Sequence, residues 1–291
     1  MTPPPVSWPW LACAAVVGYL VGSVSPAALI ARVRGVDIRS AGSGNPGATN
    51  AGRVLGRRFG YLVGLLDVLK GFVPALVFGA VADPLTAMVA GVAAVLGHCT
   101  SPWLRGRGGK GVATSFGAVL GVEPLWALVG LVAFLVVFAL TRWVALASVV
   151  ASLWVVIAAL NRWVTDSHRM SAELLVWSCA LAAIVIVRHR RNFVARLSRD
   201  ATARADPIRG LLSWLVVGAT LGAFVGVALH LTPSCNSLAV CVVQPNGSCA
   251  PDECVAWWRV VLFPAVLGAA AGMVLAGSIR ALLVHRRHVQ V

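Results

Sequence analysis

The chain has 291 residues, of which 59% are hydrophobic and 12% charged, and its mean hydropathy is +0.85. This composition excludes an ordinary soluble domain, because several apolar runs reach the ~20 residues that a helix needs to cross a bilayer. The net charge of +14 would suit a nucleic-acid-binding protein, but the positions of the charged residues along the chain indicate a different role for them. The sequence therefore predicts an all-α, polytopic integral membrane protein, a helical bundle with a seven-helix core and two extra C-terminal transmembrane helices.

Nine apolar segments are predicted to be membrane helices. The first lacks a basic leader, so we interpret it as a retained helix and not as a cleaved signal peptide. The fourth is short and is expected to be tilted, packed inside the bundle or only partly spanning. The segments are 8–31, 59–81, 85–99, 112–122, 125–141, 144–160, 172–187, 210–231 and 258–281.

Most of the 24 Lys and Arg residues fall on one side of this topology if the N-terminus lies outside the cell. Such an asymmetry is the positive-inside pattern of membrane proteins. The sequence thus predicts an external N-terminus, with the polar motif loops and the C-terminus in the cytoplasm. The charge is explained without a nucleic-acid partner.

The first polar loop carries a glycine-rich segment with chemistry suited to an anion. Glycine lets backbone N–H groups come close to a ligand, and serine, threonine and asparagine add neutral hydrogen-bonding groups. Arginine adds a planar cation that suits phosphate. By itself the segment could equally be an ordinary turn between helices. Its candidate residues are Gly42, Ser43, Asn45, Thr49, Asn50 and Arg53.

Asp67 and Lys70 lie three residues apart in the second predicted helix and so share a face. Charges at membrane depth are costly, usually paired and often functional. The pair could therefore be a structural neutralisation, part of a site, or both. His98, at the end of the third predicted helix, could be a ligand, a base or a helix-end cap.

The second inward loop holds Lys110 between glycines at 108, 109 and 111. It resembles a nucleotide-binding P-loop only superficially, because it lacks that motif's spacing and its preceding strand. It does open a helix at Val112, and helix N-termini favour phosphate. The alternative is a flexible basic loop that serves only to orient the protein.

The seventh predicted helix ends in a basic cluster at Arg188–Leu197. His189, Asn192 and Arg196 share one helical face. Such a juxtamembrane cluster could equally bind anionic lipid headgroups. Together with the two loops it would form one anion site, provided that the bundle brings all three segments together.

In order, spacing and helical context, these motifs resemble the bacterial membrane acyl-phosphate:glycerol-3-phosphate acyltransferases (PlsY) over about residues 15–200. The sequence departs from the family pattern at Gly106-Arg107, where an aromatic residue and lysine are usual, and after Leu197. The matching segments are Gly42–Asn50, Asp67–Gly71, Gly97–His98, Pro102, Gly108–Thr114 and Arg188–Leu197.

The resemblance implies transfer of a fatty acyl group from acyl-phosphate to the 1-hydroxyl of glycerol 3-phosphate, in the inner (plasma) membrane of a bacterium. It also implies a substrate-assisted mechanism, in which the phosphate of the donor accepts the hydroxyl proton. None of the six histidines has an aspartate five residues later, so the His-x4-Asp base of other glycerolipid acyltransferases is not found. His98 and His189 remain possible bases.

The resemblance implies functional roles for two groups of residues in this sequence. The catalytic candidates are Ser43, Lys110, His189 and Asn192. The substrate-binding candidates are Gly42, Asn45, Thr49, Asn50, Arg53, Asp67, Lys70, His98, Gly108, Gly109, Gly111 and Arg188. No metal-ligand spacing or nucleotide motif accompanies them, so we expect no metal and no cofactor.

Two other classes of function would use the same loops. One is a transporter or flippase for a phosphorylated lipid, although no clear internal repeat of the kind found in transporters is visible. The other is a scaffold whose basic loops bind anionic lipid. The acyltransferase is preferred because four motifs agree in register.

Residues 1–204 are predicted to form the acyltransferase membrane core, and 205–291 a two-helix extension outside the resemblance. Its outward loop, 232–257, contains Cys235, Cys241, Cys249 and Cys254, which predict two disulfides with three possible pairings. Zinc binding is the rival, but no Cys-x2-Cys spacing is present. The extension could bind a partner from lipid synthesis, guide lipid or stabilise the core.

Overall fold

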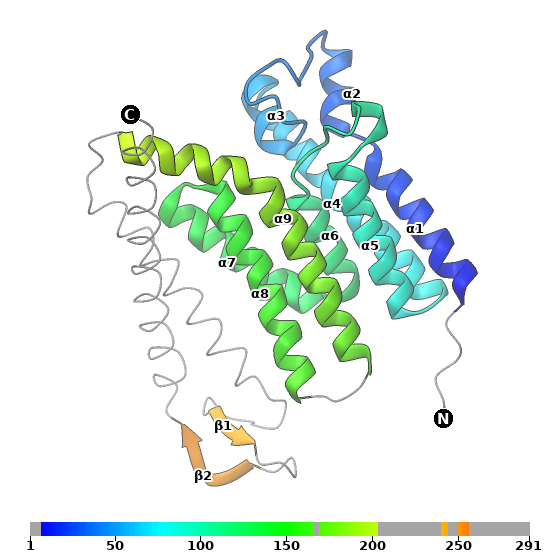
Figure 1. The fold of residues 1–291 in the computed structure, drawn as a ribbon, viewed down its shortest axis with the longest axis vertical. Coiled ribbons are helices and arrows are strands. Elements are labelled where there is room, and N and C mark those ends of the chain that lie inside the picture. The colour runs from blue at the N-terminus through cyan, green and yellow to red at the C-terminus, as the bar shows by residue number, and fades with distance from the viewer. Residues whose placement is uncertain (1–6, 166–168, 203–239, 244–248, 256–291) are drawn as a thin grey trace, which may run out of the picture. The chain divides into compact units, whose positions relative to one another are not determined.

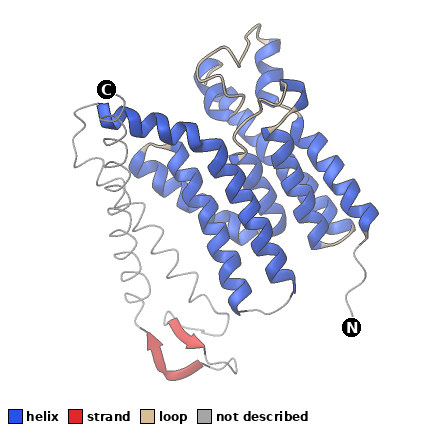
Figure 2. Cartoon of the chain, in the orientation of Figure 1, coloured by secondary structure: helices blue, strands red, loops and turns tan. Residues whose placement is uncertain are grey.

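A computed structural model describes residues 7–165, 169–202, 240–243 and 249–255. The chain divides into two compact units, Met1–Leu131 with Asp166–His189, and Val132–Thr165 with Arg190–Val291. Both units are built mainly from helices (Figures 1 and 2). The prediction of an all-α membrane bundle is confirmed, with one small β-hairpin added.

The first unit contains the helices that carry the polar motifs. They are α1 (Trp8–Ser23), α2 (Pro26–Val33), α3 (Ala48–Val54), α4 (Arg57–Val81), α5 (Pro84–Cys99), the 3₁₀ turn η1 (Pro102–Leu104), α6 (Val112–Val122), the start of α7 (Pro124–Thr141) and the first part of α9 (Arg169–Thr202). The second unit contains the rest of α7 and α9, α8 (Val144–Thr165), and strands β1 (Val240–Val243) and β2 (Cys249–Val255).

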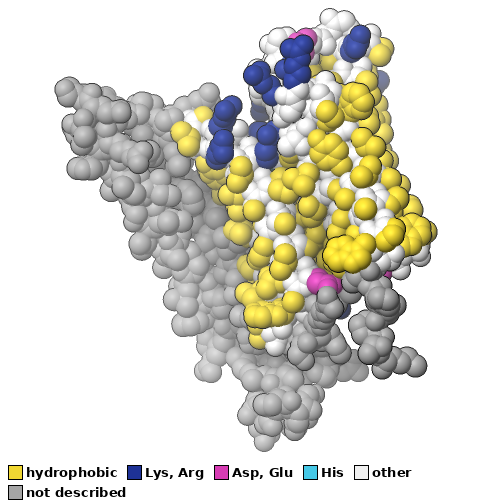
Figure 3. Space-filling model, turned by 45° about the vertical axis from the view of Figure 1, so that its right-hand side comes forward, with side chains coloured by type: hydrophobic (Ala, Val, Ile, Leu, Met, Phe, Trp, Pro, Cys, Tyr) yellow, Lys and Arg dark blue, Asp and Glu magenta, His cyan; other side chains and the backbone are white. Residues whose placement is uncertain are grey.

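Six segments of the described chain are long and apolar enough to cross a membrane. All six overlap predicted spans, and the last continues beyond residue 187, through the basic motif. The segments are Trp8–Val33, Arg57–Val81, Pro84–Leu104, Pro124–Thr141, Val144–Val164 and Ser171–Arg196. On the face seen in Figure 3, Lys and Arg side chains gather at one end, above a largely hydrophobic surface.

The first predicted helix, 8–31, is broken in two. Proline has no N–H and restricts the residue before it to extended conformations. Pro26 accordingly opens α2, and Ser25 before it is extended, with its Oγ accepting a hydrogen bond from the Ala28 N–H at 3.3 Å. We call Ser23–Ser25 the elbow of the first membrane segment.

Helix α6 is the short fourth segment and lies inside the bundle. Its 11 residues span about 16 Å at 1.5 Å per residue, against the ~30 Å of a bilayer core. It packs on α4 and α5, and Thr114, Ser115, Gly117 and Ala118 are buried there. The expectation that this segment packs inside the bundle or spans only in part agrees with the structure.

In the second unit, α7 and α8 share a core of Val137, Leu146, Ala147 and Val150. Trp143 lies beside it, with its ring centroid 4.9 Å from that of Phe193 on α9. In the antiparallel pairing of β1 and β2, Cys241 lies opposite Cys254. The predicted helices 210–231 and 258–281 lie outside the described residues, and the two disulfides stay a prediction.

Close helix contact in the first unit depends on residues without side chains. Gly18 and Gly22 on α1 face the backbone of α5, and Gly97 on α5 faces that of α1. A Cβ atom at Gly22 would collide with the Ala94 carbonyl oxygen. Small residues at such spacing let transmembrane helices approach closely, where van der Waals packing replaces the hydrophobic effect as the source of association.

We therefore expect Gly22→Ala to destabilise the protein by about 1–3 kcal/mol, the usual cost of overpacking a core. Gly64→Ala is the matched control, because a Cβ there would meet only the Ala48 Cβ at 3.5 Å, an ordinary contact. Thermal unfolding in detergent would measure both. Equal melting temperatures for the two variants would contradict the close α1–α5 packing.

Candidate active site

Asn50 holds together the first polar loop, residues 34–47 between α2 and α3 (loop one). Its side chain is buried on α3, where Oδ1 accepts from the Ser43 N–H at 2.7 Å. Its Nδ2 donates to the carbonyl oxygens of Ile38 at 3.2 Å and Ala41 at 3.0 Å. The loop turns through Gly42, whose φ of 62° would strain any other residue and where a Cβ would collide with Asn50 Oδ1. Asn50 therefore shapes the loop from within.

The other polar residues of this loop are more accessible. Ser43, Thr49 and Arg53 are exposed, while Asn45 is half-buried. Arg53 lies in the last turn of α3, and its charge acts on Lys110 in the second loop. The two glycine-rich loops therefore lie within electrostatic range of each other, the condition that the sequence leaves open.

The second glycine-rich loop, residues 105–111 between η1 and α6 (loop two), is fixed through its backbone. The Gly108 N–H donates to the Cys99 carbonyl at 3.1 Å, and the Gly109 N–H donates to the His98 carbonyl at 3.0 Å. Both glycines are buried, and a Cβ on either would collide with the end of α5. Gly111 then forms the N-cap of α6 in a left-handed conformation with φ of 83°.

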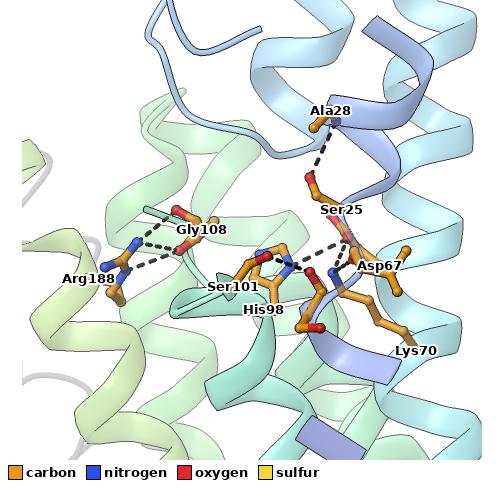
Figure 4. Close-up of polar contacts among 11 residues, drawn as sticks. Ser25, Ala28, Asp67, Lys70, His98, Ser101, Gly108 and Arg188 are labelled. Carbon is orange, nitrogen blue, oxygen red and sulfur yellow. Dashed lines mark hydrogen bonds and ion pairs between the residues drawn. The ribbon is translucent and has the colours of Figure 1, made fainter. Parts of the chain in front are cut away.

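Arg188 fastens this loop to α9. Its Nη2 donates to the carbonyl oxygens of Gly108 and Gly109, both at 2.8 Å, and its Nε donates to Gly109 at 3.1 Å (Figure 4). The planar fork of a guanidinium suits such paired acceptors. Loop two and α9 therefore lie together at Arg188, and the Nε and Nη2 donors of Arg188 bond to the backbone.

Lys110 is half-buried at the centre of the site. Burial first, and then the positive charges of Arg53 and Arg188, lower the pKa of its ammonium below the usual lysine value. A cation held among cations is stabilised when an anion binds. This cluster of Arg53, Lys110 and Arg188 is what a phosphate group requires.

His189 is buried one residue beyond Arg188, within electrostatic range of Lys110. Its Nδ1 lies 2.9 Å from the Val185 carbonyl oxygen. Because a carbonyl only accepts, Nδ1 carries the proton of this bond, so in a neutral ring Nε2 would be an acceptor. Asn192 belongs to the second unit, where its side chain is half-buried.

Asp67, Lys70 and His98 form a buried cluster below the loops. Lys70 Nζ lies 2.9 Å from Asp67 Oδ1, and His98 Nδ1 lies 3.5 Å from the same oxygen. Lys70 also donates to the carbonyl oxygen of Val24 at 3.0 Å. The structure thus pairs these charges with one another and with the backbone.

Sequence reasoning missed the residues that complete this region. Ser101 Oγ donates to the Ser23 carbonyl at 2.6 Å, and Trp103 Nε1 donates to Ser23 Oγ at 2.9 Å. Pro26 was the available signal, since a proline within a predicted helix frees carbonyl groups that need donors. Among the described residues, no three of His, Cys, Asp and Glu come together as a metal site.

The comparisons with known proteins agree with the predicted resemblance. The family model described as glycerol-3-phosphate acyltransferase matches residues 12–199. The Geobacter sulfurreducens protein named glycerol-3-phosphate acyltransferase is 46% identical over 188 residues, covering 64% of this chain and 92% of that protein. The protein of the same name from Aquifex aeolicus is 41% identical, covering 61% and 90%.

A solved structure shares the fold. It is the glycerol 3-phosphate form of PlsY, described as an integral membrane glycerol 3-phosphate acyltransferase, and it is 37% identical with a TM-score of 0.59. The match covers 65% of this chain and 92% of that one. With the family model matching well over half of its length, the chain belongs to the glycerol-3-phosphate acyltransferase family, as a multi-pass bacterial membrane protein.

Proposed function

We propose that this protein transfers a fatty acyl group from acyl-phosphate to the 1-hydroxyl of glycerol 3-phosphate. The products are 1-acyl-glycerol 3-phosphate (lysophosphatidate) and inorganic phosphate. One observation carries the proposal: Lys110, half-buried in a glycine-rich loop, is surrounded by the charges of Arg53 and Arg188. Both proposed substrates bring phosphate to this cluster.

The names of the relatives supply the acceptor and the type of reaction. The related PlsY structures are described as the glycerol 3-phosphate form and the lysophosphatidic acid form, which correspond to the proposed acceptor and product. The acyl-phosphate donor is our addition. A second phosphate group accounts for an anion site built from two loops better than a single phosphate does.

In the proposed step, the 1-hydroxyl oxygen attacks the carbonyl carbon of the donor. The new ester C–O bond forms while the C–O bond to phosphate breaks, and the electron pair leaves with the phosphate. The hydroxyl proton passes to that phosphate, so no protein base is consumed. Negative charge grows on the carbonyl oxygen and on the leaving phosphate, and fixed cations beside them supply most of the stabilisation.

The predicted catalytic residues take distinct parts in this step. Lys110 and Arg53 stabilise the leaving phosphate, and the exposed Ser43 hydroxyl donates to a phosphate oxygen at loop one. The Nε2 atom of His189 accepts a hydrogen bond from the glycerol hydroxyl and orients it. Asn192, one turn further along α9, supplies a further amide donor.

We also propose the orientation and the division that the sequence predicts. The basic loops lie in the cytoplasm and the N-terminus outside, following the positive-inside rule. Residues 1–204 act as the catalytic core, and 205–291 as an extension that a lipid-synthesis partner could bind. No metal or other cofactor takes part in the proposed step.

The donor is tested with purified protein in detergent, supplied with palmitoyl-phosphate. We expect phosphate release only when glycerol 3-phosphate is also present, with lysophosphatidate formed in equal amount. Acyl-CoA should give no product. Product from acyl-CoA, or phosphate release without the acceptor, would contradict the proposed donor and reaction.

Lys110→Met should lower kcat/KM by about 10²-fold or more, the usual cost of removing one preorganised charge donor. Arg105→Gln is the matched control, because Arg105 is an exposed cation of the same loop. Its activity should change by less than about threefold. Steady-state assays with both substrates varied would separate the two, and an equal loss in both variants would show a non-specific charge effect.

The lowered pKa of Lys110 also predicts a pH dependence. As pH rises through that pKa, the ammonium loses its proton and kcat/KM, which reports on the free enzyme, should fall. This fall, the alkaline limb of the pH profile, should occur at a lower pH than the pKa of an ordinary lysine would give. Lys110→Arg keeps its charge at any pH of the assay, so the limb should disappear in whatever activity the variant retains. An unchanged limb would assign it to another group.

A further inference from the structure

The buried cluster of Asp67, Lys70 and His98 contacts the elbow of the first membrane segment on one side and loop two on the other. The three residues are only 2%, 7% and 7% exposed, so they offer no surface to a ligand. Asp67 occupies the centre, with Lys70 Nζ at 2.9 Å and His98 Nδ1 at 3.5 Å from Oδ1 (Figure 4).

One arm of the cluster ends at the elbow of the first membrane segment. There the break at Pro26 leaves the carbonyl groups of Ser23 and Val24 without helical donors. Lys70 donates to Val24 at 3.0 Å, and Ser101, which follows α5, donates to Ser23 at 2.6 Å. The elbow leads into α2 and from there into loop one, so its direction determines where loop one begins.

The other arm ends under loop two. The His98 carbonyl accepts the Gly109 N–H at 3.0 Å. The His98 ring also lies directly against Gly109, where a Cβ would collide with its Nε2 and Cε1 atoms. The orientation that Asp67 gives this ring therefore determines the positions of Gly109 and its neighbour Lys110.

We propose that Asp67, Lys70 and His98 are positioning residues, which hold loop one and loop two in register so that Arg53 and Lys110 meet the same phosphate groups. This inference rests on the proposed function, and it replaces substrate binding as the role of these three residues. A pair that served only to neutralise itself would need no bond to the elbow. Burying charges costs free energy that hydrophobic residues would not.

The test is the double variant Asp67→Asn/Lys70→Met, which removes both formal charges. Because no single charge is left buried without its partner, the double variant should fold where a single variant could fail. We expect kcat to fall by about tenfold or more, since small misplacements of reacting groups are costly. The KM values should stay within about threefold, because Arg53, Lys110 and Ser43 are all present.

Hydrogen exchange gives a second readout that needs no substrate. Peptides covering the elbow and residues 106–111 should exchange faster in the double variant. The control is Asp83→Ala, which removes the N-cap of α5, where Asp83 accepts from the Thr86 N–H at 2.8 Å. It should lower the melting temperature while leaving loop exchange and kcat unchanged.

Each outcome of these experiments either supports or overturns the positioning role. A stable double variant with parental kcat and loop exchange would overturn the inference, as would a large rise in KM alone, which would indicate direct substrate binding. If the double variant fails to fold, Ser101→Ala tests the same arm without altering a charge, and unchanged kcat and exchange there would overturn it. Absence of acyl-phosphate-dependent activity in the parent would reject the proposed function alone, because the exchange comparison would still stand.

Discussion

The site depends on one constraint, that buried backbone carbonyl groups need donors where the helix does not supply them. The elbow of the first membrane segment and the glycine turn of loop two are two such places. In both, a cation supplies the donor: Lys70 bonds the Val24 carbonyl, and Arg188 bonds those of Gly108 and Gly109. The irregular backbone that forms an anion site can persist in the bundle because charged side chains satisfy it.

This constraint divides the cations of the motifs into two groups. Lys70 and Arg188 are committed to the backbone, whereas Lys110 and Arg53 have no such bond among the hydrogen bonds of the described chain. Arg188 still contributes its charge to the site while its Nε and Nη2 donors are occupied. A phosphate at Lys110 would also lie in the fields of Arg53 and Arg188, which fall with distance but are weakly screened in a partly buried site.

Much of this was predictable from the sequence, and the rest fails for identifiable reasons. The apolar runs predict most of the long helices within about five residues, because hydrophobic length is a strong signal, but the first is broken before Pro26 and the last continues to Thr202. The family motifs predict which polar segments converge. The sequence could not show that Asn50 faces inward, since an asparagine side chain can hydrogen-bond either to the backbone of its own loop or to a bound ligand. It also could not assign Arg188 to the backbone, because the acceptors are carbonyls of glycines that leave no side-chain pattern.

These contacts change the interpretation of the glycines in loop two. A flexible loop would suit weak anion binding, but Gly108 and Gly109 are held on one side by carbonyls of α5 and on the other by Arg188. Their lack of a side chain permits close packing on His98 and Cys99, so the residues that look most flexible in the sequence are among the most constrained. A rigid loop keeps Lys110 in place before substrate arrives. Fixed charge of this kind can stabilise a transition state without reorganisation during the reaction.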